Sequence, residues 1–291
     1  MIPGQFDYVR PANMHDALRI LADREGDAKV LSGGYSLLPL IKLRLAQPAL
    51  LVDIRDVDGL DGIVETDDEL RIGGRATHRR ILEDPAVKAR YPLLTDAAGG
   101  IGDPQVRNWG TIGGSCAHAD PSSDWPAVLL ATRATLICQS STGGRPIAAT
   151  DFFIDTFQTS IEPTELLIEV RIPRWPSGSG GAYAKLERRA GDFSTVGVAV
   201  MVRMGSDGRI ADSGVGLTAV AETPFASAGA IGALIGAEPS EATFRAAGAA
   251  AAAESRPTKD GHGPVAYKRA MAEEMTVRAL RSAVGRALGQ R

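Results

Sequence analysis

The chain has 291 residues, of which 44% are hydrophobic and 23% charged, a composition that excludes disorder over its whole length. Its 32 Lys and Arg residues against 35 Asp and Glu residues leave a net charge of −3, which argues against nucleic acid as a partner. The length is enough for roughly two domains at about 100 to 200 residues each.

The number of cysteines and the distribution of apolar residues limit which metal sites and which cellular locations are expected. Cys116 and Cys138 are the two cysteines, enough for one disulfide but too few for a four-cysteine iron–sulfur cluster or zinc site. Residues 1–10 lack the pattern of a signal peptide, and no apolar run approaches the ~20 residues of a membrane helix. We therefore expect no metal site and no transmembrane segment on this chain, and a cytoplasmic location.

The N-terminal pattern predicts a small unit with a glycine-rich turn at its centre. Residues 13–24 place apolar side chains at helical spacing, with Asn13 as a candidate N-cap. Short apolar segments at 28–31 and 50–54 predict strands, and the apolar residues of 37–45 fall on one helical face between them. The first ~55 residues are therefore typical of a βαβ-type unit.

The rest of the chain predicts paired strands with interspersed helices. Strands are expected over residues 62–65, 70–73, 135–139, 145–149, 165–172, 182–188, 196–204 and 209–220. Helices are expected over residues 77–83, 92–98, 124–133, 226–234, 241–254 and 265–288. Residues 173–181 are rich in Pro, Gly and Ser and predict a linker at a domain boundary. The last three helices are rich in alanine, which suits close packing on a sheet or on a neighbouring element.

Two glycine-rich segments are candidates for binding an anion. Neither the G-x-G-x-x-G fingerprint nor a glycine–lysine pair occurs, so the Rossmann and P-loop routes to nucleotide binding are absent. The first glycine-rich segment is Ser32-Gly33-Gly34-Tyr35-Ser36, and the second is Thr111-Ile112-Gly113-Gly114-Ser115. Paired glycines let backbone amides approach an anion such as a pyrophosphate. Taken singly, each segment is better explained as an ordinary tight turn.

Polar residues around the second glycine-rich segment weaken that simpler explanation. Asp124 has two interpretations of about equal weight, a hydrogen bond to a ribose hydroxyl or the N-cap of the following helix. His118 has no partner at metal-ligand spacing, which favours a structural or solvent-facing role.

Several spaced motifs resemble the FAD-binding medium subunit of the molybdenum hydroxylase family, which includes carbon monoxide dehydrogenase and xanthine dehydrogenase. These motifs are SGGYSLLP at 32–39, KLR at 42–44, DPQVR at 103–107, GTIGGS at 110–115 and ADP at 119–121. The resemblance covers nearly the whole chain. It implies an α+β fold: a two-part FAD-binding fold of the vanillyl-alcohol-oxidase type over 1–175, with subdomains of about 1–55 and 56–175, and a C-terminal domain of antiparallel strands and helices over 176–291.

The resemblance also assigns cofactor contacts residue by residue. It implies that main-chain amides of both glycine-rich segments hold the FAD pyrophosphate, and that Asp124 lies near the ribose or the phosphates. Leu167 matches an apolar contact, and Lys185 matches a lysine near the flavin ring, where a cation stabilises negative charge on the reduced flavin. Phe193 aligns with an aromatic residue near the flavin in some relatives, and a buried core phenylalanine is a comparable alternative.

Two positions depart from the common family pattern. Tyr35 stands where relatives often carry histidine or glutamine, and Ser115 stands where asparagine is frequent. Both hydroxyls can still form hydrogen bonds, so we expect FAD binding to be kept with altered contacts.

The resemblance implies an electron-transfer subunit with non-covalent FAD and no catalytic residue of its own for substrate hydroxylation. Molybdenum cofactor and two-iron two-sulfur clusters are expected only on a large and a small partner subunit, in a dimer of heterotrimers that passes electrons to an external acceptor. Two alternatives remain: a self-sufficient FAD oxidase or dehydrogenase, and a flavin-binding module without turnover. The four scattered histidines argue against the first, because they suggest no acid–base cluster.

Overall fold

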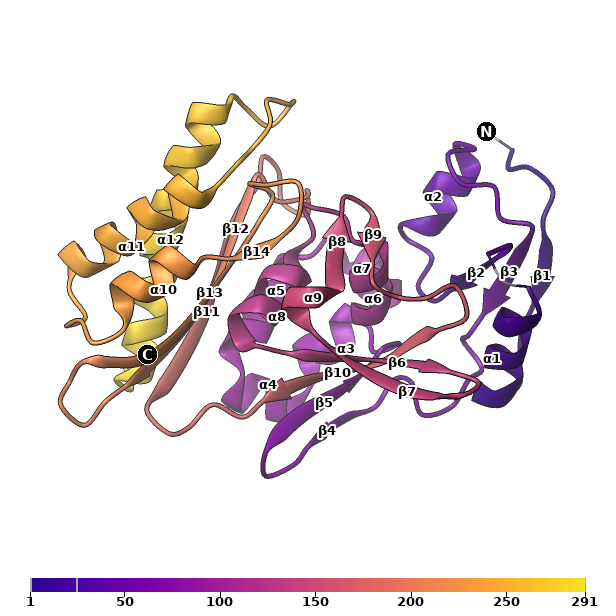
Figure 1. Ribbon diagram of the computed structural model, residues 1–291, viewed down its shortest axis with the longest axis horizontal. Helices are drawn as coiled ribbons and strands as arrows, with labels where there is room; N and C mark the ends of the chain where they lie inside the picture. The colour runs from indigo at the N-terminus through magenta and orange to yellow at the C-terminus, as the bar shows by residue number, and fades with distance from the viewer. Residues whose placement is uncertain (1, 25, 291) are drawn as a thin grey trace.

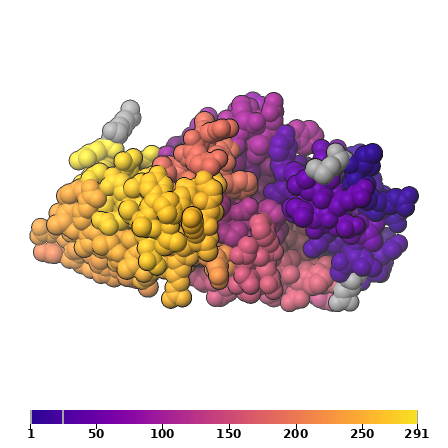
Figure 2. All heavy atoms as spheres, turned by 90° about the horizontal axis from the view of Figure 1, so that it is seen from above, coloured from indigo at the N-terminus to yellow at the C-terminus, as the bar shows by residue number. Residues whose placement is uncertain are grey.

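The computed structural model describes residues 2–24 and 26–290, which form three parts arranged along the long axis (Figure 1). The indigo N-terminal part and the yellow C-terminal helices lie at opposite ends, with the middle part between them. A view from above shows the same order (Figure 2). Within the described residues, no helix has the length and apolar character needed to cross a membrane.

The N-terminal part is a three-stranded parallel sheet of order β1-β3-β2. Its elements are β1 (Asp7–Val9), α1 (Met14–Asp23), β2 (Ala28–Leu31), α2 (Leu37–Lys42) and β3 (Leu50–Asp53). The Asn13 Oδ1 accepts from the Asp16 amide at 2.9 Å, which confirms the predicted cap of α1. The βαβ-type unit is therefore confirmed, while the sequence prediction missed β1 because this strand has three residues and largely exposed side chains.

The middle part contains a five-stranded antiparallel sheet and most of the short helices. The sheet order is β4-β5-β10-β6-β7, with β4 (Ile63–Glu65), β5 (Glu69–Gly73), β6 (Thr135–Ser140), β7 (Gly143–Ala148) and β10 (Leu166–Pro173). The other elements are α3 (His78–Glu83), α4 (Pro85–Arg90), α5 (Pro92–Gly100), α6 (Pro104–Trp109), α7 (Ile112–His118), α8 (Asp124–Thr132), α9 (Ala149–Phe152), β8 (Phe153–Asp155) and β9 (Gln158–Thr159). The sequence prediction missed α4 and α6, although Asp-Pro pairs at the N-cap and first helical position of both mark their starts.

The C-terminal part is a four-stranded antiparallel sheet of order β11-β12-β13-β14, with three helices. Its elements are β11 (Ser179–Leu186), β12 (Val196–Met204), β13 (Ile210–Thr218), β14 (Phe225–Ala226), α10 (Ala228–Leu234), α11 (Glu241–Glu254) and α12 (Val265–Ala287). The α12 helix packs on β11 and β12 and buries Ala272, Ala279 and Ala283. Small side chains let this helix lie close to the sheet, as the sequence predicted. The strand β11 begins at Ser179, so the last three residues of the predicted linker are already paired.

The α8 helix joins the middle and C-terminal parts, because it is buried along its whole length and contacts β12 and β13. Trp125 of this helix is fully buried in the middle core. Ser123 occupies the N-cap position and Asp124 is the first helical residue. The interpretation of Asp124 as the cap is therefore wrong, and its carboxylate lies at the boundary between two parts of the molecule.

Candidate functional site

The first glycine-rich segment, which joins β2 to α2, leaves its backbone donors free. The amides of Gly33, Gly34, Tyr35 and Ser36 donate to no acceptor among the described residues. Gly34 has φ +81°, in the left-handed region that glycine adopts without strain. A run of unpaired amides at a turn is a ready site for an anion.

The second glycine-rich segment is largely closed, because the amides of residues 112–115 donate to acceptors inside the fold. The Ile112 amide donates to the Ala76 carbonyl at 3.0 Å and the Gly113 amide to the Gly74 carbonyl at 2.9 Å. The Thr111 Oγ1 accepts from the Gly114 amide at 3.1 Å, and the Thr111 carbonyl accepts from Ser115 at 3.0 Å. This segment is thus the start of α7 rather than a turn, and the expected binding of FAD through its main-chain amides stays a prediction. Its hydroxyl groups and the Thr111 amide, which has no acceptor among the described residues, are the polar groups it offers.

The two glycine-rich segments lie side by side although 79 residues separate Ser32 from Thr111, whose hydroxyl oxygens are 3.0 Å apart. A Cβ at Gly33 would overlap the Trp109 carbonyl, and a Cβ at Gly113 would overlap the Gly74 carbonyl. Glycine at these two positions lets backbone segments from different parts of the fold touch. The structure therefore brings four free amides next to a pair of hydroxyls.

A buried ion pair joins β11 of the C-terminal part to α8 of the middle part. The Lys185 Nζ on β11 is 3.2 Å from the Asp124 Oδ2 on α8, and the two side chains are 8% and 6% exposed. Lys185 also donates to the Gly100 carbonyl at 2.8 Å and lies 3.3 Å from the Glu187 Oε2. The ammonium therefore faces two carboxylates, so the net charge of this trio is −1 when all three are ionised.

Asp124 is held by two hydroxyls that the sequence analysis did not single out. The Tyr183 hydroxyl donates to the Asp124 Oδ1 at 2.6 Å and the Ser194 hydroxyl at 2.9 Å. Burial raises the pKa of Asp124, while Lys185 and these hydrogen bonds oppose the rise. Burial and the neighbouring Asp124 raise the pKa of Tyr183 well above its usual value, so Tyr183 stays a donor. Asp124 therefore fixes the position of Lys185.

Leu167 is buried, whereas Phe193 is exposed to solvent. Leu167 is 6% exposed on β10, and a Cβ at Gly74 would overlap its carbonyl oxygen. Phe193, in the loop between β11 and β12, is 51% exposed. The alternative that Phe193 is a buried core residue is therefore wrong.

His78, His118 and the two cysteines pack inside the fold or against neighbouring rings. The His78 Nδ1 accepts from the Trp125 Nε1 at 3.0 Å, and burial lowers the pKa of His78 to about 3. The His118 ring lies 5.0 Å from the Phe157 ring. Cys116 and Cys138 are free and buried, so they form no disulfide. Among residues 2–24 and 26–290, His, Cys, Asp and Glu form no group able to hold a metal ion.

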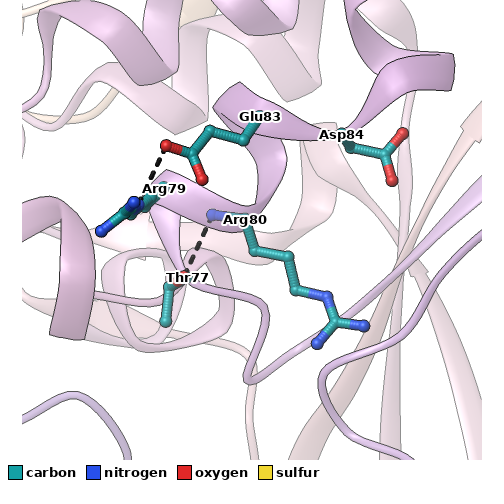
Figure 3. Close-up of a pocket in the computed structure, with 5 residues that line it drawn as sticks. All are labelled: Thr77, Arg79, Arg80, Glu83 and Asp84. Atoms are coloured by element: carbon teal, nitrogen blue, oxygen red, sulfur yellow. Dashed lines mark hydrogen bonds and ion pairs between the residues drawn. The ribbon is translucent and has the colours of Figure 1, made fainter.

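Two hollows on the surface differ in what they offer a ligand. One, of about 470 Å³, lies over α3 and is lined by Thr77, Arg79, Arg80, Glu83 and Asp84 (Figure 3). Its charged groups already have partners, because Arg79 pairs with Glu83 at 2.9 Å and Arg80 with Asp61 at 2.9 Å. The other, of about 490 Å³, opens beside the first glycine-rich segment and is lined by Leu31, Ser32, Gly33, Gly34, Tyr35, Leu38, Pro39, Lys42, Arg55 and Trp109. Only the second hollow borders free amides.

Comparison with known proteins identifies the family. Residues 4–175 match the FAD binding domain in molybdopterin dehydrogenase, and residues 181–283 match the CO dehydrogenase flavoprotein C-terminal domain. The chain belongs to the FAD-binding medium-subunit family of the carbon monoxide dehydrogenase and xanthine dehydrogenase type. It is 41% identical to the carbon monoxide dehydrogenase medium chain of Hydrogenophaga pseudoflava over 98% of this chain and 99% of that one.

Further relatives of this medium subunit differ in the activity that their names state. The chain is 37% identical to the 6-hydroxypseudooxynicotine dehydrogenase complex subunit alpha of Paenarthrobacter nicotinovorans, over 99% of this chain and 97% of that one. The reconstituted CO dehydrogenase from Oligotropha carboxidovorans contains a chain that superposes with a TM-score of 0.95 at 40% identity, covering 98% of this chain and 100% of that one. The α+β fold, the FAD cofactor and the role of medium subunit in an oxidoreductase complex, all expected from the sequence, are thereby confirmed.

The site geometry fits FAD. The free amides of the first glycine-rich segment and the adjacent hydroxyls are donors that a pyrophosphate accepts. Sequence reasoning missed the residues that hold Asp124 and Lys185, namely Tyr183, Ser194 and Glu187. It also missed those beside the first glycine-rich segment, Lys42, Arg55 and Trp109. One available signal was the spacing of two on β11, which puts Tyr183 and Lys185 on one face of the strand.

Proposed function

We propose that this medium subunit binds FAD non-covalently across its three parts and passes electrons from an iron–sulfur subunit to an external acceptor. The observation that carries the proposal is the set of free amides at Gly33, Gly34, Tyr35 and Ser36 beside the Ser32–Thr111 hydroxyl pair. Neither glycine-rich segment contains the histidine or cysteine that a covalent flavin link uses.

The proposed FAD contacts divide by chemical type. Ser32, Gly33, Gly34, Tyr35 and Ser36 hold the pyrophosphate through amides and hydroxyls, and Thr111 and Ser115 add hydroxyls. Ile112, Gly113 and Gly114 shape the segment beneath the pyrophosphate. Leu167, Phe193, Asp124 and Lys185 surround the flavin end.

The chain's own residues set the charge at the flavin end. When bound, FAD supplies the exchange of electrons between a one-electron donor and an acceptor. Lys185 is held by Asp124 and Glu187, so its positive charge is largely compensated before any ligand arrives. Lys185, the cation expected to stabilise negative charge on the reduced flavin, therefore lies beside two carboxylates that oppose this effect. The balance of the three charges sets the reduction potential of the flavin.

The wider assembly follows from the same proposal. A large subunit with the molybdenum cofactor and a small subunit with two-iron two-sulfur clusters complete a heterotrimer, and two heterotrimers pair. The proposed domain division is 1–175, split at about residue 55, and 176–291; Met1 and Arg291, the outer limits, lie outside the described residues. The location predicted from the sequence, the cytoplasm, belongs to this proposal too.

Release of the cofactor and reconstitution test the proposal. Acid precipitation of the purified chain is expected to release FAD, identified by chromatography, with none left on the denatured protein. With both partner subunits and a substrate of the complex, the flavin absorbance is expected to bleach. Omission of the iron–sulfur subunit is expected to abolish the bleaching. Rapid bleaching of the isolated chain by purines, aldehydes or N-heterocycles would instead establish a self-sufficient dehydrogenase.

A further inference from the structure

The buried cluster of Lys185, Asp124 and Glu187 holds its two carboxylates unequally. The hydroxyls of Tyr183 and Ser194 donate to the Asp124 Oδ1 at 2.6 and 2.9 Å. The Lys185 ammonium donates to the Asp124 Oδ2 at 3.2 Å. By contrast, the Glu187 Oε2 is buried without a hydrogen bond to any described residue, and the Lys185 Nζ lies 3.3 Å from it outside hydrogen-bond geometry. A proton on Glu187 therefore displaces no donor, whereas a proton on Asp124 competes with three.

The cluster carries a net charge of −1 when its three groups are ionised. Reduction of the flavin adds further negative charge at this end of the site. Like charges repel more strongly at a partly buried site than in water, and this repulsion favours the neutral form of a carboxylate. We propose that Glu187 takes up a proton when the flavin is reduced and releases it when the flavin is reoxidised. This inference rests on the proposed function, because it needs FAD beside Lys185.

The proton step balances without a further reactant. An O–H bond forms at the Glu187 carboxylate with a proton from solvent as the electrons arrive from the iron–sulfur subunit. The same bond breaks, and the proton returns to solvent, when the external acceptor removes the electrons. The Glu187 side chain is 27% exposed, while those of Lys185 and Asp124 are 8% and 6% exposed. Solvent protons therefore reach Glu187 more directly than Asp124.

Lys185 is the cation that lies within ion-pair distance of Glu187 among the described residues. The titratable and charged groups on the elements around Glu187 are Tyr183 and Lys185 of β11, Asp124 of α8, Arg107 of α6, Arg188, Arg189 and Asp192 of its own loop, and His262 of the connector between α11 and α12. Arg107 donates to the Gly102 carbonyl at 2.7 Å, and the Arg188 Nε lies 3.8 Å from the Asp192 Oδ2. The charge of Glu187 therefore acts mainly on Lys185, and its neutralisation leaves the ammonium opposed by Asp124 alone.

The pH dependence of the flavin reduction potential tests the proposal. Potentiometric titration of the full-length chain loaded with FAD, between about pH 6 and pH 9, counts the protons taken up per two electrons. Glu187→Gln keeps the shape of the side chain and removes its charge and its proton site. We expect the natural chain to take up as much as about one more proton per flavin than this variant over part of the range.

The sign of the difference in potential is also fixed. At pH 9 the natural cluster keeps its net negative charge, so Glu187→Gln should have the higher reduction potential. The two potentials should approach each other as the pH falls, because the natural chain then gains the proton on reduction. Reduction at an electrode in weakly buffered solution, followed with a pH indicator dye, counts the same proton directly.

Two further variants separate the proton site from a general change in structure. Glu187→Asp keeps a carboxylate and should retain the extra proton. Glu222→Gln removes an exposed carboxylate on the loop between β13 and β14 and should match the natural chain in potential and proton count. Equal proton counts in Glu187→Gln and the natural chain would overturn the assignment of Glu187 while FAD binding stands. Failure of the natural chain to bind FAD would overturn the proposed function itself.

Discussion

The two glycine-rich segments have similar sequences, but they differ in whether their backbone amides have acceptors inside the fold. Each has two adjacent glycines between hydroxyl residues, yet the amides of residues 33–36 are free while those of residues 112–115 donate to acceptors inside the fold. In the first, glycine provides a left-handed turn at Gly34. In the second, Gly113 lets the backbone lie against Gly74. A glycine pair therefore predicts close backbone approach, but it does not tell whether the approaching group is a ligand or the protein.

The largest effect is expected from a side chain at Gly113. Gly113→Val places a branched side chain against the Gly74 carbonyl, and overpacking against backbone should lower the free energy of unfolding by about 3 kcal/mol. Thermal and urea unfolding of the flavin-free chain measure this loss. FAD content should fall only as folded protein is lost. A well-folded variant without flavin would show instead that the second segment binds FAD through its backbone.

Acid should lower the free energy of unfolding through His78, which lies beside the second glycine-rich segment. The His78 amide donates to the Gly110 carbonyl at 3.0 Å, and burial holds the pKa of the ring at about 3, against 6.5 in the unfolded chain. The folded chain keeps this ring neutral. The part of the free energy of unfolding that depends on the neutral ring is therefore fully present above pH 6.5 and is lost as the pH falls toward 3. At pH 5 the loss is roughly 2 kcal/mol.

Urea unfolding between pH 7.5 and 5 measures the contribution of His78. His78→Gln should be less stable than the natural chain at pH 7.5, because a buried partner of Trp125 is altered, but should lose less stability on acidification. His15→Gln changes an exposed histidine and should follow the natural pH dependence. An unchanged slope in His78→Gln would show that carboxylates alone cause the acid sensitivity.

Gly34→Ala should reduce FAD affinity more than stability. Left-handed φ in alanine costs about 1 to 2 kcal/mol, and the new Cβ would lie 3.0 Å from the Leu38 Cδ1. The turn must shift, which moves the free amides and should weaken FAD binding about tenfold. Gly59 has the same φ, +81°, with open space around it, so Gly59→Ala should have a similar backbone cost with FAD affinity unchanged. Equal FAD affinity in both variants would exclude the first segment from the cofactor site.

Local patterns in the sequence predicted most elements and marked the first glycine-rich segment as a candidate anion site. Asn13 before α1 and the alternating apolar residues of β12 act within a few positions, so their elements were predicted correctly. The closed state of the second segment depends on carbonyls of Gly74 and Ala76, which the chain brings close only after the middle sheet forms. Likewise, Tyr183 and Ser194 reach Asp124 from 59 and 70 residues away. No local periodicity encodes such contacts.

The smallest effect is expected from the hydroxyl pair that joins the two segments. Ser32→Ala removes the hydrogen bond between the Ser32 and Thr111 hydroxyls at 3.0 Å, while Thr111 still accepts from the Gly114 amide. A neutral, partly exposed hydrogen bond contributes about 0.5 to 1.5 kcal/mol, so we expect a stability loss near the lower end of that range.

FAD affinity shows whether the Ser32 hydroxyl only links the two segments or also contacts the ligand. FAD titration of Ser32→Ala should show a loss of about three- to tenfold, because the ligand loses a donor and the two segments lose their link. Ser140→Ala breaks a comparable hydroxyl pair with Thr142 at 2.9 Å on the exposed β6–β7 turn and should leave FAD affinity unchanged. If Ser32→Ala also bound FAD as tightly as the natural chain, the hydroxyl pair would be a structural link between the segments, and the free amides alone would account for pyrophosphate binding.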